Sequence, residues 1–112
     1  MNYRSKIELY NMDCFEYMKT CKDNQFDLAI VDPPYGIGAN KMTLGNGKNK
    51  IYRGENDWDS EIPKKEYWDE LMRISKDQVV WGGNYFTEFL TPTGAWIFWD
   101  KGTGDNDFAD GE

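Results

Sequence analysis

Residues 26–35 read Phe-Asp-Leu-Ala-Ile-Val-Asp-Pro-Pro-Tyr and join a short apolar run to a pair of prolines. The run Leu28–Val31 is continuous, a pattern typical of a strand buried on both faces in a parallel sheet. Pro33 and Pro34 lack N–H donors and hold φ at about −65°, so the strand ends and the backbone continues rigid and extended. The sequence therefore predicts that residues 32–35 lie at the carboxyl end of a central strand, where open α/β sheets bind ligands.

This Asp-Pro-Pro-Tyr segment resembles the catalytic motif of S-adenosylmethionine-dependent DNA amino-methyltransferases, specifically the N6-adenine enzymes. The resemblance implies an incomplete, Rossmann-like α/β fold of the class I methyltransferase type, with three layers and a mostly parallel sheet. It also implies that Tyr35 stacks on a flipped base. Related cytosine-N4 enzymes more often carry Ser-Pro-Pro, so Asp32 favours adenine while cytosine stays open as the alternative target. The catalytic residues implied are Asp32, Pro33, Pro34 and Tyr35.

A second segment, Asn11-Met12-Asp13-Cys14, resembles the turn in this family whose Asp contacts the adenine of the cofactor. Here Met12 stands where the family has Gly. The resemblance implies that Asp13, Cys14 and Asp32 bind S-adenosylmethionine. From the residues alone, Asp13 is equally well explained as the N-cap of a helix.

That helix is predicted over Cys14–Cys21, and Glu16 follows Asp13 by three residues, as in a variant of the capping box. The two cysteines of the chain lie seven residues apart on one side of the helix. We interpret them as buried thiols rather than as a disulfide or a zinc site. The predicted apolar face consists of Cys14, Met18 and Cys21.

Residues 36–59 form the longest irregular segment and are rich in Gly, Asn and Lys. Long loops in compact domains are usually functional or disordered, so we expect a mobile loop over the base pocket. Four cations and no acid lie between Gly36 and Gly54, which predicts contacts with the phosphates of double-stranded DNA. A solvated loop without such contacts is the alternative. The predicted contacts in this loop are Lys41, Lys48, Lys50 and Arg53.

Four further elements are expected along the chain. A first strand is predicted over Lys6–Tyr10, and Pro63 opens a helix that reaches about Ser75. Further strands are predicted over Gln78–Trp81 and Ala95–Trp99. The helix is expected to bury a broad apolar face made of Tyr67, Trp68, Leu71, Met72 and Ile74.

The segment Trp81-Gly82-Gly83-Asn84 resembles the part of the family that lines the base pocket, which makes Asn84 a candidate nucleic-acid contact. Loop closure alone explains both glycines equally well, and Asn84 also suits the N-cap of a short helix through Leu90. The glycines of residues 100–104 resemble a cofactor-binding glycine loop, yet no helix follows to close it. We expect residues 100–112 to form an acidic, frayed tail.

Composition limits the remaining possibilities. A chain of 112 residues is enough for one small domain over residues 1–112, with a modest core. The net charge of −7 argues against a general nucleic-acid binder, and the lack of His excludes Ser-His and Cys-His catalysis and most catalytic zinc sites, so no metal is expected. No signal peptide or membrane span is recognisable, which predicts a cytoplasmic protein of a bacterium or a phage-infected cell.

The order of motifs predicts a fragment. Family members with an early catalytic motif carry target-recognition and methionine-binding segments after it, and nothing in the chain resembles either. The resemblance therefore covers nearly all residues but only the first half of such an enzyme. We expect the chain alone to bind S-adenosylmethionine weakly or not at all, to be inactive, and to associate with a missing C-terminal half or with itself through open strand edges. A non-catalytic remnant or interaction module is the alternative.

Overall fold

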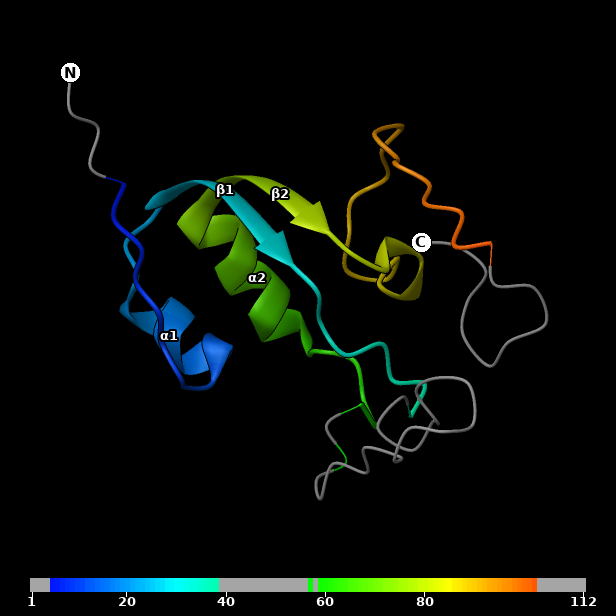
Figure 1. Cartoon of the computed structure of the whole chain (residues 1–112), viewed down its shortest axis with the longest axis horizontal. Helices are drawn as coiled ribbons and strands as arrows, with labels where there is room; N and C mark the ends of the chain where they lie inside the picture. Colours follow the sequence, from blue (N-terminus) through cyan, green and yellow to red (C-terminus); the bar gives the residue numbers. More distant parts are fainter. Residues whose placement is uncertain (1–4, 39–56, 58, 103–112) are drawn as a thin grey trace.

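A computed structural model describes residues 5–38, 57 and 59–102. These residues form a small α/β unit with a two-stranded parallel sheet and two helices (Figure 1). The α/β class and the parallel pairing predicted from the sequence are confirmed. In chain order the elements are α1 (Cys14–Thr20), β1 (Phe26–Val31), α2 (Lys65–Ile74), β2 (Ser75–Val80) and a 3₁₀ turn (Gly83–Tyr85).

Helix α1 begins as its sequence predicts. Asp13 is the N-cap, and its Oδ1 accepts a hydrogen bond from the Glu16 backbone N–H at 3.1 Å. Met18 and Cys21 are buried on the face that points to the core. Cys14 is exposed, so the prediction that both thiols are buried is wrong for Cys14, which sits in the first turn beyond the packed part of the face.

Helix α2 runs directly into strand β2. Its buried residues Trp68, Leu71 and Ile74 recur every third position and form one stripe along the helix. Met72 was predicted on the same face, but it is 41 % exposed because it follows Leu71 around the helix and points away from the stripe. At the junction, the Ser75 hydroxyl donates to the Leu71 carbonyl at 2.6 Å, which satisfies one of the carbonyls left unpaired at the helix end.

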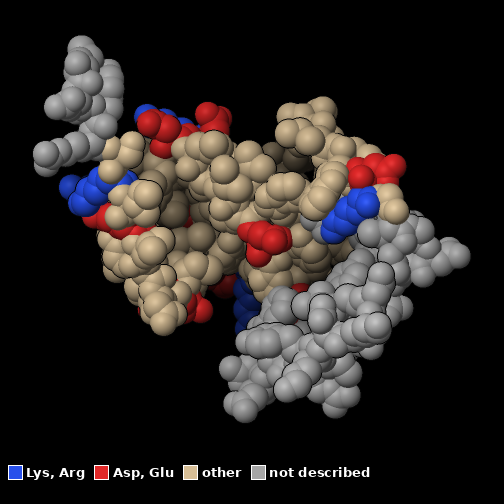
Figure 2. Space-filling model, in the orientation of Figure 1, with Lys and Arg blue, Asp and Glu red and all other residues tan. Residues whose placement is uncertain are grey.

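The two helices cover only one face of the sheet. Ala29 and Val31 pack against the core beneath α2, whereas Leu28 is 50 % exposed and Ile30 is 64 % exposed on the other face. The described residues therefore form two layers, and the prediction of a strand buried on both faces is wrong here. Figure 2 shows that the surface over β1 and β2 is largely uncharged.

Two predicted strands do not form. The segments 6–10 and 95–99 have no strand pairing within the described residues, and Ile7 and Ile97 are more than four-fifths exposed. A strand is stabilised by hydrogen bonds to a neighbouring strand and by packing against its side chains. A segment with the apolar pattern of a strand therefore does not form one when no neighbouring strand is present. The second segment packs through side chains instead: the Trp99 ring meets Trp81 edge-on, with 5.6 Å between ring centroids.

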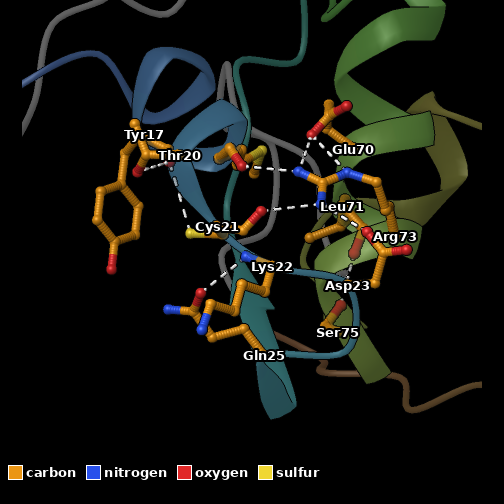
Figure 3. Close-up of polar contacts among 11 residues, drawn as sticks. Tyr17, Thr20, Cys21, Lys22, Asp23, Gln25, Glu70, Leu71, Arg73 and Ser75 are labelled. Atoms are coloured by element: carbon orange, nitrogen blue, oxygen red, sulfur yellow. Dashed lines mark hydrogen bonds and ion pairs between the residues drawn. The ribbon is translucent and has the colours of Figure 1, made fainter.

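Arg73 joins α2 to the turn between α1 and β1 (Figure 3). Its Nη1 donates to the Cys21 carbonyl at 2.9 Å and to Asp23 Oδ1 at 2.8 Å, and its Nη2 donates to the Met18 carbonyl at 3.0 Å. Hydrogen bonds to Glu70 and Asp23 hold the pKa of the guanidinium above its usual range. One side chain thus adds a second donor to the Met18 carbonyl, which already accepts from the Cys21 N–H, and gives a donor to the Cys21 carbonyl just after α1.

Replacing Arg73 with methionine should therefore lower the melting temperature by about 10 °C, because two backbone carbonyls and two carboxylates each lose one hydrogen-bond donor. The matched control is Lys65→Met, which removes an exposed ion pair with Asp69 on the same helix and should change the melting temperature by about 2 °C at most. Circular dichroism on heating measures both. Equal melting temperatures for the two variants would show that Arg73 is only another surface cation.

Candidate functional site

The carboxyl ends of β1 and β2 meet at one edge of the sheet because the strands are parallel. The Trp81 backbone N–H donates to the Val31 carbonyl at 2.9 Å, which extends the pairing by one residue beyond β2. Asp32 follows β1 directly, at the position that the sequence predicts. The segments after the two strands therefore leave the sheet side by side.

A pocket of about 720 Å³ opens beside this edge. Its wall is formed by the start of α1, by the end of β1 and the residues that follow it, and by the first turn of α2. The wall is largely apolar. The pocket brings together residues from two motifs that lie far apart in the chain. The predicted site residues that line it are Asp13, Cys14, Asp32, Pro33 and Pro34.

Tyr35 is held outside this lining. Its hydroxyl donates to Asp32 Oδ1 at 2.6 Å, a distance typical of a strong bond to a charged acceptor. Its ring stacks on Tyr85, with 4.8 Å between centroids and an interplanar angle of 12°. The stacking of Tyr35 on a base stays a prediction, and here the residue orients the carboxylate of its own motif.

Gly82 explains how Tyr35 reaches this place. Its φ is +66°, and a Cβ built on it would lie 2.3 Å from Tyr35 Cε1, so the close approach requires glycine. Gly82 is also the N-cap of the 3₁₀ turn, so the prediction that Asn84 caps a helix through Leu90 is wrong. Asn84 is exposed and is not among the residues that line the pocket.

Asp59 anchors the backbone that follows the motif. It is 1 % exposed, its Oδ1 accepts from the Gly36 N–H at 3.0 Å, and its carbonyl accepts from the Gly38 N–H at 3.0 Å. Sequence reasoning placed Asp59 only at the end of the long loop. In the sequence, the only feature that marks this position is an acidic residue directly after Trp58, and it does not predict the contact with Gly36. Lys41, Lys48, Lys50 and Arg53 lie outside the described residues.

Two titratable groups in the pocket wall are held in their neutral form. Cys14 is exposed as a residue, but its thiol is partly desolvated in the pocket wall, and this desolvation and then the charge of Asp13 raise its pKa. Burial raises the pKa of Tyr67 to about 12. The pocket therefore offers neutral and apolar surface, which suits a ring system, next to charged groups. These are the carboxylates of Asp13, Asp32 and Glu66 and the ammonium of Lys64. No group of three or more acidic or Cys side chains in the described parts of the chain is arranged to hold a metal ion.

The raised pKa of Tyr67 makes stability depend on pH in the alkaline range. Its stabilising effect is complete below the unfolded-state pKa of about 10 and is lost as the pH rises through about 12, because the unfolded chain releases the proton first. We expect the urea midpoint of the wild type to fall more steeply between pH 10 and 12 than that of Tyr67→Phe. Tyr10→Phe, at an exposed tyrosine, is the control and should follow the wild type. Parallel curves for all three proteins would contradict the assignment.

No protein-family model, curated protein or solved structure matches the chain. Among the described residues, no helix has the length and apolar character that crossing a membrane requires. The interpretation of the site therefore depends on its residues, its geometry and the resemblance of its motifs.

Proposed function

We propose that the pocket is the methyl-transfer site of an S-adenosylmethionine-dependent DNA N6-adenine methyltransferase, carried by an incomplete class I, Rossmann-like fold. One observation supports this most. Asp13 and Cys14, assigned to the cofactor, line a single pocket with Pro33 and Pro34 of the catalytic motif. Asp32, assigned to both the cofactor and the catalytic motif, lines it too. The two groups of residues are separated in the chain by α1 and β1.

The acceptors at the end of β1 suit the chemistry of the target. The exocyclic nitrogen of adenine is a poor nucleophile because its lone pair is delocalised into the ring. The Asp32 carboxylate and the Pro33 carbonyl are the two acceptors for its N–H bonds, and both acceptors favour a more tetrahedral, more nucleophilic nitrogen. Pro33 and Pro34 fix the backbone between strand and loop, so the second acceptor is held in place before the base arrives.

The opposite wall suits the methyl donor. When bound, S-adenosylmethionine supplies a methyl group on a positively charged sulfur. The carboxylates of Asp13 and Asp32 bring negative charge to the pocket, while apolar side chains of α1 offer a surface for the adenine ring. The chain would act by positioning. Asp13 and Cys14 would hold the donor, and Asp32 and the Pro33 carbonyl would hold the target amine, so that the methyl group could pass from sulfur to nitrogen in line while one amine proton is released to water.

Alkylation of Cys14 tests whether the cofactor binds here, since this exposed thiol lines the pocket while Cys21 is buried. We expect 5 mM S-adenosylhomocysteine to slow iodoacetamide labelling of Cys14 about sixfold if the Kd is about 1 mM, or about −4.1 kcal/mol. Uridine at the same concentration should leave the rate unchanged, and Asp13→Ala should weaken the protection. An unchanged Cys14 rate in a chain with a folded far-UV spectrum would show that the chain alone forms no cofactor site of millimolar affinity at this pocket.

The target base is tested by labelling aspartate with ¹³C at Cγ and observing Asp32. In the presence of S-adenosylhomocysteine, 2′-deoxyadenosine should move the Asp32 resonance, whereas the analogue without the exocyclic amine should not. 2′-Deoxycytidine separates the alternative target, because a larger shift with this nucleoside would favour cytosine-N4 chemistry. The Asp69 resonance on α2 serves as the internal control, since Asp69 is exposed and paired with Lys65.

A further inference from the structure

Tyr85 contacts the Asp-Pro-Pro-Tyr motif through Tyr35, and no pattern in the sequence predicted a role for it. It comes from the 3₁₀ turn after β2, and its ring stacks on Tyr35 rather than lining the pocket. The Tyr35 hydroxyl in turn bonds Asp32, the proposed acceptor for the target amine. Three side chains from two strand ends therefore form one continuous series of contacts that ends at the pocket.

We propose that Tyr85, seated by Gly82, is a positioning residue for the Asp32 carboxylate and acts through Tyr35. The inference rests on the proposed function for the role of Asp32 toward the base. The contacts themselves are present in the protein without any ligand. Tyr85 would therefore govern how well the site accepts a base that carries an exocyclic amine.

The first step is the placement of Tyr85. The Tyr85 N–H donates to the Gly82 carbonyl at 2.9 Å and closes the turn, so the ring is returned toward the end of β1. Phe86, the next residue, is fully buried and lies 6.0 Å from Tyr35 between centroids. The turn is thus anchored in the core on one side and in contact with Tyr35 on the other.

The second step is the restriction of Tyr35. The near-parallel ring of Tyr85 covers one face of Tyr35, and the glycine at position 82 allows the backbone to lie against the same side chain. An offset stack of this kind contributes about 1 kcal/mol beyond its buried area. The ring is therefore held in one orientation, which directs its hydroxyl toward Asp32.

The third step is the orientation of Asp32. The terminal torsion of an aspartate is broad, and an exposed carboxylate samples it freely unless a partner holds one oxygen. Asp32 is exposed, and the bond from Tyr35 engages its Oδ1 at 2.6 Å. The carboxylate plane is thereby set, which leaves Oδ2 as the acceptor for the amine of the base.

The test measures the Asp32 ¹³Cγ resonance without any nucleoside. Tyr35→Phe removes only the hydroxyl and should shift this resonance by several linewidths. Tyr85→Leu should produce at least half of that shift although Tyr85 does not touch Asp32, whereas Tyr85→Phe, which keeps the ring, should leave the resonance at the wild-type position. Asp69 should not move in any variant.

An Asp32 resonance that stays at the wild-type position in Tyr85→Leu, while Tyr35→Phe shifts it, would overturn the proposal. If Tyr85→Leu loses the dispersed spectrum of the folded chain, Tyr85→Met, which keeps most of the bulk without the ring, takes its place. Adding 2′-deoxyadenosine then tests the consequence: the ligand-induced shift of Asp32 should be at least twofold smaller without the ring of Tyr85. Because the first readout needs no ligand, failure of the proposed function and failure of this inference give different results.

Discussion

Replacing Phe86 with alanine is expected to lower the free energy of unfolding by about 4 kcal/mol. Phe86 is 0 % exposed, and its ring lies 4.8 Å from Trp68 and 6.0 Å from Tyr35 between centroids. The substitution removes the residue that connects α2 to the segment after β2. A domain of this size is stable by only about 5–15 kcal/mol, so the loss is a large part of the total.

The matched control is Phe98→Ala, because Phe98 is the same residue type and is 76 % exposed. It should change the free energy of unfolding by less than about 0.5 kcal/mol. Urea denaturation followed by far-UV circular dichroism measures both variants. Similar midpoints for the two would mean that Phe86 is not part of the core in solution.

Gly82→Ala is expected to destabilise the chain by about 3 kcal/mol, from two independent causes. A left-handed φ of +66° costs an alanine about 1 kcal/mol, and the new Cβ would lie 2.3 Å from Tyr35 Cε1. Relieving that overlap requires Tyr35 to move or the 3₁₀ turn to shift, at a further cost of about 2 kcal/mol. The change should therefore also move the Asp32 ¹³Cγ resonance.

Two other glycines separate these causes. Gly38 has φ +72° with nothing within 4 Å of an added Cβ, so Gly38→Ala should cost about 1 kcal/mol, the backbone term alone. Gly94 is open and has an ordinary φ, so Gly94→Ala should be neutral or slightly stabilising. Urea midpoints should rank the variants in that order. Equal losses at Gly82 and Gly38 would contradict the contact between Gly82 and Tyr35.

Features that depend on a few neighbouring residues could be predicted from the sequence. Asp13 caps α1 because a short acidic side chain lies directly before a helical run, and β1 ends at Val31 because two prolines come soon after it. The spacing of Trp68, Leu71 and Ile74 likewise identified the buried stripe of α2. Asp13 and Asp32 line the same pocket. Their assignment to the cofactor came from the resemblance of two motifs and stays a prediction.

Features that depend on distant partners could not be predicted. The segments 6–10 and 95–99 have the composition of strands but no neighbour to pair with among the described residues, and β1 has a helical layer on one face only. Asp59 accepts a hydrogen bond from Gly36, 23 positions earlier in the sequence, and no pattern around Asp59 predicts that contact. Tyr85 meets Tyr35 only because two parallel strands end at the same edge.

Helix caps, the proline-terminated strand and the buried stripe of α2 could be predicted from the sequence, because steric and hydrogen-bonding preferences act between residues a few positions apart. The orientation of Tyr35, the anchoring of its backbone by Asp59 and the exposure of Leu28 and Ile30 were set by packing between segments far apart in the chain. Burial and side-chain direction depend on which surfaces meet, and that is a property of the folded arrangement rather than of any local stretch.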